Sequence, residues 1–110
     1  VEDAQAYPAT YPQLLTGDMN CAGDNAAIDC FRQGGWVDTH TTLHGAQNPQ
    51  TFHGFRGDRH DGSSGKIDWV FARGEIVPIA SEIVREQRDG HYMSDHDFVR
   101  VDLRMCGADA

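Results

Sequence analysis

Residues 66–72 (KIDWVFA) carry the pattern that most restricts what this chain can fold into. Ile67, Trp69 and Phe71 recur at every second position, and Asp68 lies between the first two. Because successive side chains of a β-strand point to opposite faces, this alternation predicts a strand with its large apolar side chains on one face. Asp68 is then expected on the opposite face, away from the aromatic rings.

Four other segments have patterns that predict regular elements, separated by glycine and proline signals. They are a strand at residues 13–16 stopped by Gly17, a helix capped by Asp24 or Asn25 and ended by Gly34-Gly35, a strand at residues 76–85 in which Pro78 indicates an edge or a bulge, and a last strand at residues 98–103. Asp89-Gly90 marks a turn before that last strand. This order of elements predicts an α+β fold with a mostly antiparallel sheet.

The stretch between residues 38 and 65 is rich in Gly, His, Thr, Asn and Asp. It is predicted to be mostly irregular, with a short strand at residues 51–55. Loops of this length are uncommon in compact domains and tend to be functional, so this stretch is the expected determinant of substrate choice. Five of its polar residues have no predicted role as ligands: His40, His44, Asp58, His60 and Asp61.

Composition and charge narrow the class of protein. The 110 residues suffice for one domain, and 39% hydrophobic with 24% charged residues is a globular balance. The core is expected to contain the large aromatic side chains Trp36, Trp69, Phe71 and Phe98. No apolar run approaches the roughly 18 residues of a membrane span, so no span is predicted. The three cysteines show no metal-binding spacing and leave the redox compartment open.

The net charge of −8 argues against a strong grip on nucleic acid, because counterion release needs clustered cations. A nucleic-acid substrate nevertheless stays compatible with the sequence, since a bound metal ion would change the local field.

Three short motifs place polar groups at or near the ends of predicted strands. They are GDMN at residues 17–20, KIDWVF at residues 66–71 and SDHD at residues 94–97. Because strand ends of a sandwich converge, these groups are expected to share one cleft.

The residue types of these motifs suit phosphoester cleavage, which needs an activated water, a cation and a donor to the phosphoryl oxygens. The carboxylate of Asp18 can orient and deprotonate water, and the amide of Asn20 can hold a phosphate oxygen. Asp95 offers a hard oxygen ligand to Mg²⁺. His96 can bond a phosphate oxygen, while Asp68 can hold the His96 ring in one tautomer.

Taken in order, these segments resemble motifs of the endonuclease/exonuclease/phosphatase superfamily, the deoxyribonuclease-I-like enzymes. The matching segments are LTGDMN at 15–20, TFHGF at 51–55, KIDWVF at 66–71 and SDH at 94–96. The resemblance implies a four-layer α/β/β/α sandwich and Mg²⁺- or Mn²⁺-dependent hydrolysis. It also implies the roles just given to Asp18, Asn20, Asp68, Asp95 and His96. For His53 two roles stay open, one in lining the substrate cleft and one in ordering its loop.

The chain departs from the family pattern in what precedes the first motif. Family members supply an Asn, a Glu and usually a second His from the first half of the domain, whereas only 16 residues precede Gly17 here. Residues 1–110 are therefore expected to be the C-terminal portion of one such domain, with the N-terminal half absent. That half, or a homodimer partner, is expected to cover the sheet. The isolated chain is expected to bind metal weakly and to be slow or inactive.

Competing motifs fail on spacing or context. An EF-hand loop beginning at Asp18 would have Ala22 where an oxygen ligand is needed. A phosphate-binding P-loop at residues 62–66 would have Ile67 in place of Ser or Thr, and a serine hydrolase using Ser94 lacks the Gly-x-Ser-x-Gly elbow. A non-catalytic remnant that serves as a binding or structural domain remains the alternative. The substrate stays open among nucleic acid, a lipid head group and a small molecule.

Overall fold

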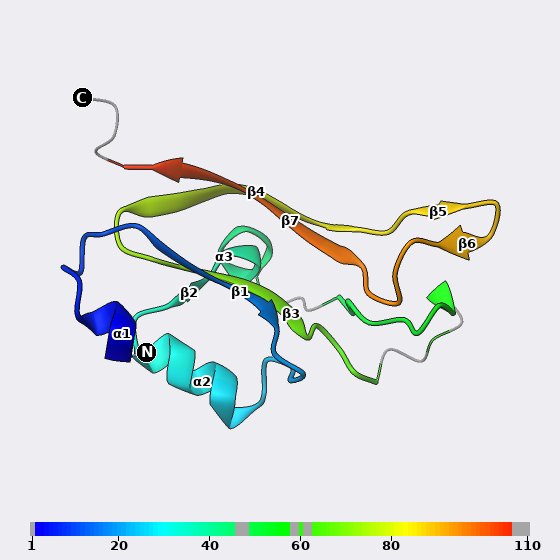
Figure 1. Ribbon diagram of the computed structural model, residues 1–110, viewed down its shortest axis with the longest axis horizontal. Coiled ribbons are helices and arrows are strands. Elements are labelled where there is room, and N and C mark those ends of the chain that lie inside the picture. The colour runs from blue at the N-terminus through cyan, green and yellow to red at the C-terminus, as the bar shows by residue number, and fades with distance from the viewer. Residues whose placement is uncertain (1, 46–48, 58–59, 61–62, 107–110) are drawn as a thin grey trace.

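The computed structural model describes residues 2–45, 49–57, 60 and 63–106 and shows a mixed α/β fold in which the described strands pair antiparallel (Figure 1). The elements in chain order are α1 (Glu2–Gln5), β1 (Gln13–Asp18), α2 (Ala26–Gln33), β2 (Val37–Asp38), α3 (Thr39–His44), β3 (Asp68–Arg73), β4 (Ile76–Val84), β5 (Gln87–Arg88), β6 (His91–Tyr92) and β7 (Phe98–Met105). The predicted α+β class is confirmed.

A three-stranded sheet in the order β1-β3-β2 carries the core on one face. Trp69 and Phe71 of β3 are buried there and pack with Ile28 of α2 and with Trp36. Their alternation with Asp68 sends the carboxylate to the other face, as predicted. In Figure 1, α2 runs below this sheet while β4 and β7 lie above it.

Helix α2 begins where the sequence indicated. The side chain of Asn25 accepts a hydrogen bond of 2.9 Å from the backbone N–H of Ala27, which satisfies one of the free donors at the helix start. Gly34 caps the other end. Ile28 is the residue through which the helix reaches the core.

Strands β4 and β7 form a second, long antiparallel pair. Its register shifts between Pro78 and Ala80, so the bulge predicted at Pro78 is confirmed. This pair packs on α3 through Ser81, whose hydroxyl lies 2.8 Å from Nδ1 of His40. The carbonyl of Ser81 also accepts a hydrogen bond of 2.6 Å from Nε2 of His44. The two histidines thus have partners that the sequence did not identify.

Three expectations need correction. The predicted strand at residues 51–55 is wrong, because this segment forms only an isolated bridge between Phe52 and His96. Helix α3 occupies part of the stretch expected to be irregular. Phe98 is 47% exposed instead of buried in the core. Asp58 and Asp61 lie outside the described residues.

No helix in the described part of the chain is long and apolar enough to cross a membrane.

Candidate functional site

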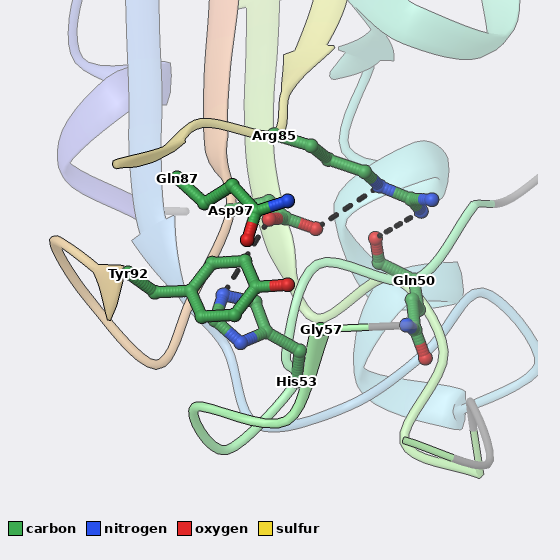
Figure 2. A pocket seen from close by; sticks show the side chains of 7 residues that line it. All are labelled: Gln50, His53, Gly57, Arg85, Gln87, Tyr92 and Asp97. Carbon is green, nitrogen blue, oxygen red and sulfur yellow. Dashed lines mark hydrogen bonds and ion pairs between the residues drawn. The ribbon is translucent and has the colours of Figure 1, made fainter. Parts of the chain in front are cut away.

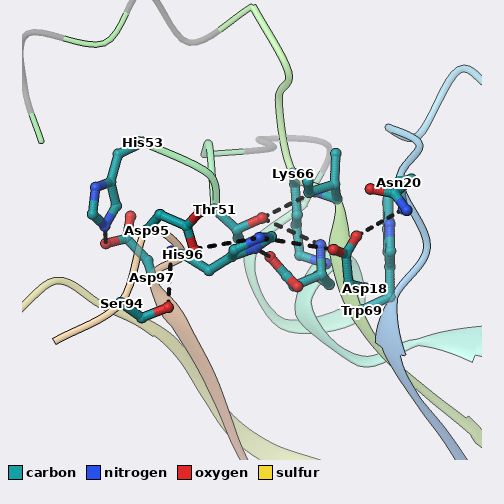
Figure 3. Close-up of polar contacts among 12 residues, drawn as sticks. Asp18, Asn20, Thr51, His53, Lys66, Trp69, Ser94, Asp95, His96 and Asp97 are labelled. Atoms are coloured by element: carbon teal, nitrogen blue, oxygen red, sulfur yellow. Dashed lines mark hydrogen bonds and ion pairs between the residues drawn. The ribbon is translucent and has the colours of Figure 1, made fainter. Parts of the chain in front are cut away.

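Three side chains from distant segments meet at one edge of the three-stranded sheet. Asp18 ends β1, Asp68 begins β3, and these two residues are direct cross-strand partners. His96 approaches from the loop before β7. One ligand atom from each of the three lies within 4.8 Å of the other two. The convergence expected from the strand ends is therefore present (Figure 3).

His96 is held by carboxylates on both of its ring nitrogens. Its Nδ1 donates to Oδ2 of Asp68 at 2.8 Å, which fixes the tautomer when the ring is neutral. Its Nε2 lies 3.7 Å from Oδ2 of Asp18 and 4.0 Å from Oδ1 of Asp95. The hydrogen bond to Asp68 is the main cause that raises the pKa of His96, aided by the charges of Asp68, Asp18 and Asp95 and opposed by burial.

Asn20 supports the cluster through its backbone. Its N–H donates to Oδ1 of Asp18 at 2.8 Å, and its φ of 52° is in the left-handed region that Asn tolerates better than most residues. This turn holds the carboxylate of Asp18 at the end of β1. The side chain of Asn20 is exposed and lies beside Asp18 in Figure 3.

The backbone of Asp68 is held by two buried side chains. Its N–H donates to Oγ1 of Thr51 at 3.2 Å, and its carbonyl accepts from Nζ of Lys66 at 2.7 Å. Nζ of Lys66 also lies 3.6 Å from the centroid of the Trp69 ring. Burial lowers the pKa of Lys66 to about 8, although the carboxylates of Asp38 and Asp68 oppose that shift.

The cluster lines an open cleft of about 280 Å³ between β3 and the start of β7. Its other walls include Thr16, Trp69, Phe98 and Val99. Phe98, which the sequence placed in the core, is thus an aromatic wall of the cleft.

The donor set suits a divalent cation. Asp18, Asp68 and Asp95 bring carboxylates to one imidazole, and oxygen ligands of this kind are what Mg²⁺ and Mn²⁺ prefer. The carboxylates of Asp18 and Asp95 are partly exposed and so accessible to an ion from solvent. The residues of the site fit a metal ion.

His53 lies next to this cluster but its ring belongs to a second, smaller pocket of about 100 Å³ (Figure 2). Nε2 of His53 lies 3.5 Å from Oδ1 of Asp97, whose other oxygen is 3.2 Å from Nε of Arg85. The ring of Tyr92 packs on the His53 ring with centroids 4.6 Å apart. Nδ1 of His53 is buried without a hydrogen-bond partner among the described residues.

The backbone of the HGF segment orders the loop that carries Asp95. The N–H groups of His53 and Gly54 both donate to the carbonyl of Asp95, at 2.9 and 3.1 Å. Of the two roles open for His53, this geometry matches the ordering of the loop. Contact of His53 with substrate stays a prediction, and its ring is not among the residues that line the cleft.

Comparison of the chain with protein-family models, with curated proteins and with solved structures finds no match.

Sequence reasoning missed four residues that shape the site region: Thr51, Lys66, Arg85 and Asp97. Thr51 and Lys66 were inside the motifs, but nothing in the sequence shows that their side chains bind the backbone of Asp68. Asp97 follows the SDH motif directly, and its adjacency to His96 was the one available signal.

Proposed function

We propose that this chain belongs to a divalent-metal-dependent phosphoester hydrolase of the endonuclease/exonuclease/phosphatase type, acting by an activated water. The observation that carries the proposal is the meeting of Asp18, Asp68 and His96, whose ligand atoms lie within 4.8 Å of one another. These residues come from three of the four segments that carry the family resemblance.

Each side chain has a role that its contacts support. Asp18, partly exposed beside Nε2 of His96, orients and deprotonates the attacking water. Asp68 binds Nδ1 of His96 and so directs Nε2 into the cleft. The raised pKa of His96 favours the protonated ring, whose Nε2–H can donate to a phosphoryl oxygen.

Asp95 and the neighbouring carboxylates would hold Mg²⁺ or Mn²⁺. When bound, the ion polarises the phosphoryl group and offsets its developing negative charge. The exposed amide of Asn20 adds a neutral donor for a phosphate oxygen.

A covering partner belongs to the same proposal. Leu14, Thr16 and Asp18 alternate along β1 and share the face opposite Leu15 and the core, and Leu14 is 50% exposed. We propose that the first half of a four-layer sandwich, or a second copy of the chain, covers this face. The isolated chain would then be weakly active or inactive, because the family's Asn and Glu come from that first half.

Metal binding and hydrolysis test the proposal separately. Mn²⁺ binding is followed by electron paramagnetic resonance, and hydrolysis is followed on a diester and a monoester with Mg²⁺ or Mn²⁺. Asp18→Asn removes a cleft carboxylate, and Asp29→Asn is the matched control because Asp29 is an exposed acid on α2 paired with Arg32.

The proposal expects Mn²⁺ binding that Asp18→Asn weakens and Asp29→Asn leaves unchanged, with any hydrolysis following the same order. Binding that is absent, or equally affected by both substitutions, contradicts it and favours the non-catalytic alternative.

A further inference from the structure

Strand β3 extends beyond its neighbour β2, and this leaves backbone groups that need other partners. β2 pairs with β3 only at Ala72 and Phe71. Asp68, at the start of β3, pairs with β1 on one side, and no strand in the described part of the chain pairs with it on the other. Buried backbone groups without partners are costly, so something must replace the missing strand there.

The hydroxyl of Thr51 supplies the missing acceptor. Its Oγ1 accepts from the N–H of Ile67 at 3.0 Å and from the N–H of Asp68 at 3.2 Å. Thr51 is 0% exposed, so water does not compete for these bonds. On the side away from β1, the N–H groups at the start of β3 are therefore held by this hydroxyl, while Nζ of Lys66 binds the carbonyl of Asp68.

The backbone of Thr51 binds the other half of the site. Its carbonyl accepts from the N–H of Asp97 at 2.6 Å, and its N–H donates to the carbonyl of Gly65 at 3.2 Å. The segment that carries Asp95 and His96 is thus joined to the same residue that holds Asp68. Figure 3 shows Thr51 between these segments.

We propose that Thr51 is a positioning residue that sets Asp68 and His96 at hydrogen-bond distance. The importance of the Asp68–His96 pair for catalysis rests on the function proposed above. The claim that Thr51 sets the distance between Asp68 and His96 rests on the contacts alone. Threonine suits the position because its β-branched side chain is stiff at χ1 and aims the hydroxyl along one direction. Without the hydroxyl, two buried N–H groups lose their acceptor and the start of β3 can shift.

Three variants separate positioning from mere stability. Thr51→Val keeps the shape and removes the hydroxyl, while Thr51→Ser keeps the hydroxyl. Thr39→Val is the matched control, since Thr39 is also 0% exposed and its Oγ1 donates to the carbonyl of Val70 in the same strand at 2.7 Å. It should cost similar stability and leave Asp68 in place.

The readout is the ¹⁵N NMR spectrum of the His96 ring in the metal-free chain, recorded at a pH high enough to make the ring neutral, where it shows which ring nitrogen carries the proton. Wild type, Thr51→Ser and Thr39→Val should show a protonated Nδ1, and Thr51→Val should show a mixture of tautomers. Mn²⁺ binding by Thr51→Val should be about 10- to 100-fold weaker, as for other residues that orient ligands. A wild-type ring spectrum in folded Thr51→Val overturns the proposal.

An additional measurement on the wild type keeps the test decisive if Thr51→Val does not fold. The amide protons of Ile67 and Asp68 should exchange with solvent as slowly as those in the middle of β3, because Oγ1 of Thr51 protects them. Fast exchange at both positions overturns the proposal. If wild type binds no Mn²⁺ while the NMR contrast holds, the proposed function fails and the positioning role of Thr51 stands.

Discussion

Two histidine–aspartate pairs lie side by side in this molecule, and they differ in nearly everything except residue type. His96 and Asp68 are joined at 2.8 Å with 26% and 20% of their side chains exposed. His53 and Asp97 lie 3.5 Å apart with only 3% and 5% exposed. Asp68 begins β3 and Asp97 directly precedes β7. His53 and His96 come from the TFHGF and SDH segments.

The neighbours of each pair explain what it does. Asp97 is neutralised by Arg85, 3.2 Å from its second oxygen, so the buried pair is balanced by a cation of the protein. Around His96, Asp18 and Asp95 add further negative charge at 3.7 and 4.0 Å. The charge around the more exposed pair therefore suits a cation from solvent, whereas the buried pair already has a cation of the protein in Arg85. The residue types of the two pairs are the same, so they do not distinguish the two roles. The charges of the neighbouring side chains distinguish them.

Asp68→Asn should have the largest effect. The substitution keeps the shape but removes the carboxylate that fixes Nδ1–H of His96, so hydrolysis by the metal-loaded chain, reassembled with its proposed covering half, should fall about 100- to 10,000-fold. Asp97→Asn, the same change in the buried pair, should alter the rate only a few-fold. Steady-state assays of the two variants compare them directly. Equal losses of activity would erase the distinction between the pairs.

Lys66 gives the next largest effect, because its buried ammonium group is bonded to the backbone of Asp68. Its Nζ donates to the carbonyl of Asp68 instead of a carboxylate, and burial lowers its pKa to about 8. The unfolded chain then binds more protons than the folded chain between that value and 10.5, so stability should rise with pH across this window. Between pH 7.5 and 10 the gain from Lys66 should be about 2 kcal/mol.

Urea unfolding of wild type and Lys66→Met at both pH values measures this gain, because other titrating groups cancel in the difference. Lys66 is also the only lysine, so one ¹³Cε signal reports its titration directly. An unshifted titration near 10.5 would mean that Lys66 is solvated and available to balance the carboxylates.

Asp97→Asn should reduce stability by about 2 kcal/mol, since it removes the buried negative charge that pairs with both His53 and Arg85. Mn²⁺ affinity should stay within about two-fold of wild type, because Asp97 faces Arg85 and His53. Denaturant unfolding and Mn²⁺ titration of the same preparation check both statements. A variant that keeps its stability but loses the ion would reverse the assignment of the two pairs.

The convergence of the site was predictable because it follows from local pattern. Alternation in KIDWVF put Asp68 opposite the aromatic rings, and the strand predicted at residues 13–16 put Asp18 close to its end. The predicted stop at Gly17 is wrong, because β1 continues through Gly17 to Asp18. Helix α3 was not predictable, since its sequence THTTLH is poor in helix formers. The helix is stabilised locally by the Asp38 cap and, through tertiary contacts, by the bonds of its histidines to Ser81.

The supporting contacts were out of reach for a different reason. Thr51 and Lys66 bind the backbone of Asp68 at a point where β2 no longer pairs with β3, because the pairing of β2 ends at Phe71. The sequence around Thr51 and Lys66 does not indicate where the pairing of β2 ends. The exposure of Phe98 was also not predictable from nearby residues. Its strand alternates as predicted, but which face is covered depends on elements far away in the chain.

Substitution of the aromatic residue beside each pair should have the smallest effect on the free energy of unfolding. The size of that effect should still differ between the two pairs. Phe98 lines the cleft beside His96 and is 47% exposed, whereas Tyr92 packs on the buried ring of His53. Phe98→Ala should therefore cost about 1 kcal/mol or less, because little apolar area leaves a closed environment. Tyr92→Ala should cost more, since it also opens the pocket above a buried pair. Unfolding curves in urea rank the two, and a larger loss for Phe98→Ala would show that the cleft wall belongs to the core after all.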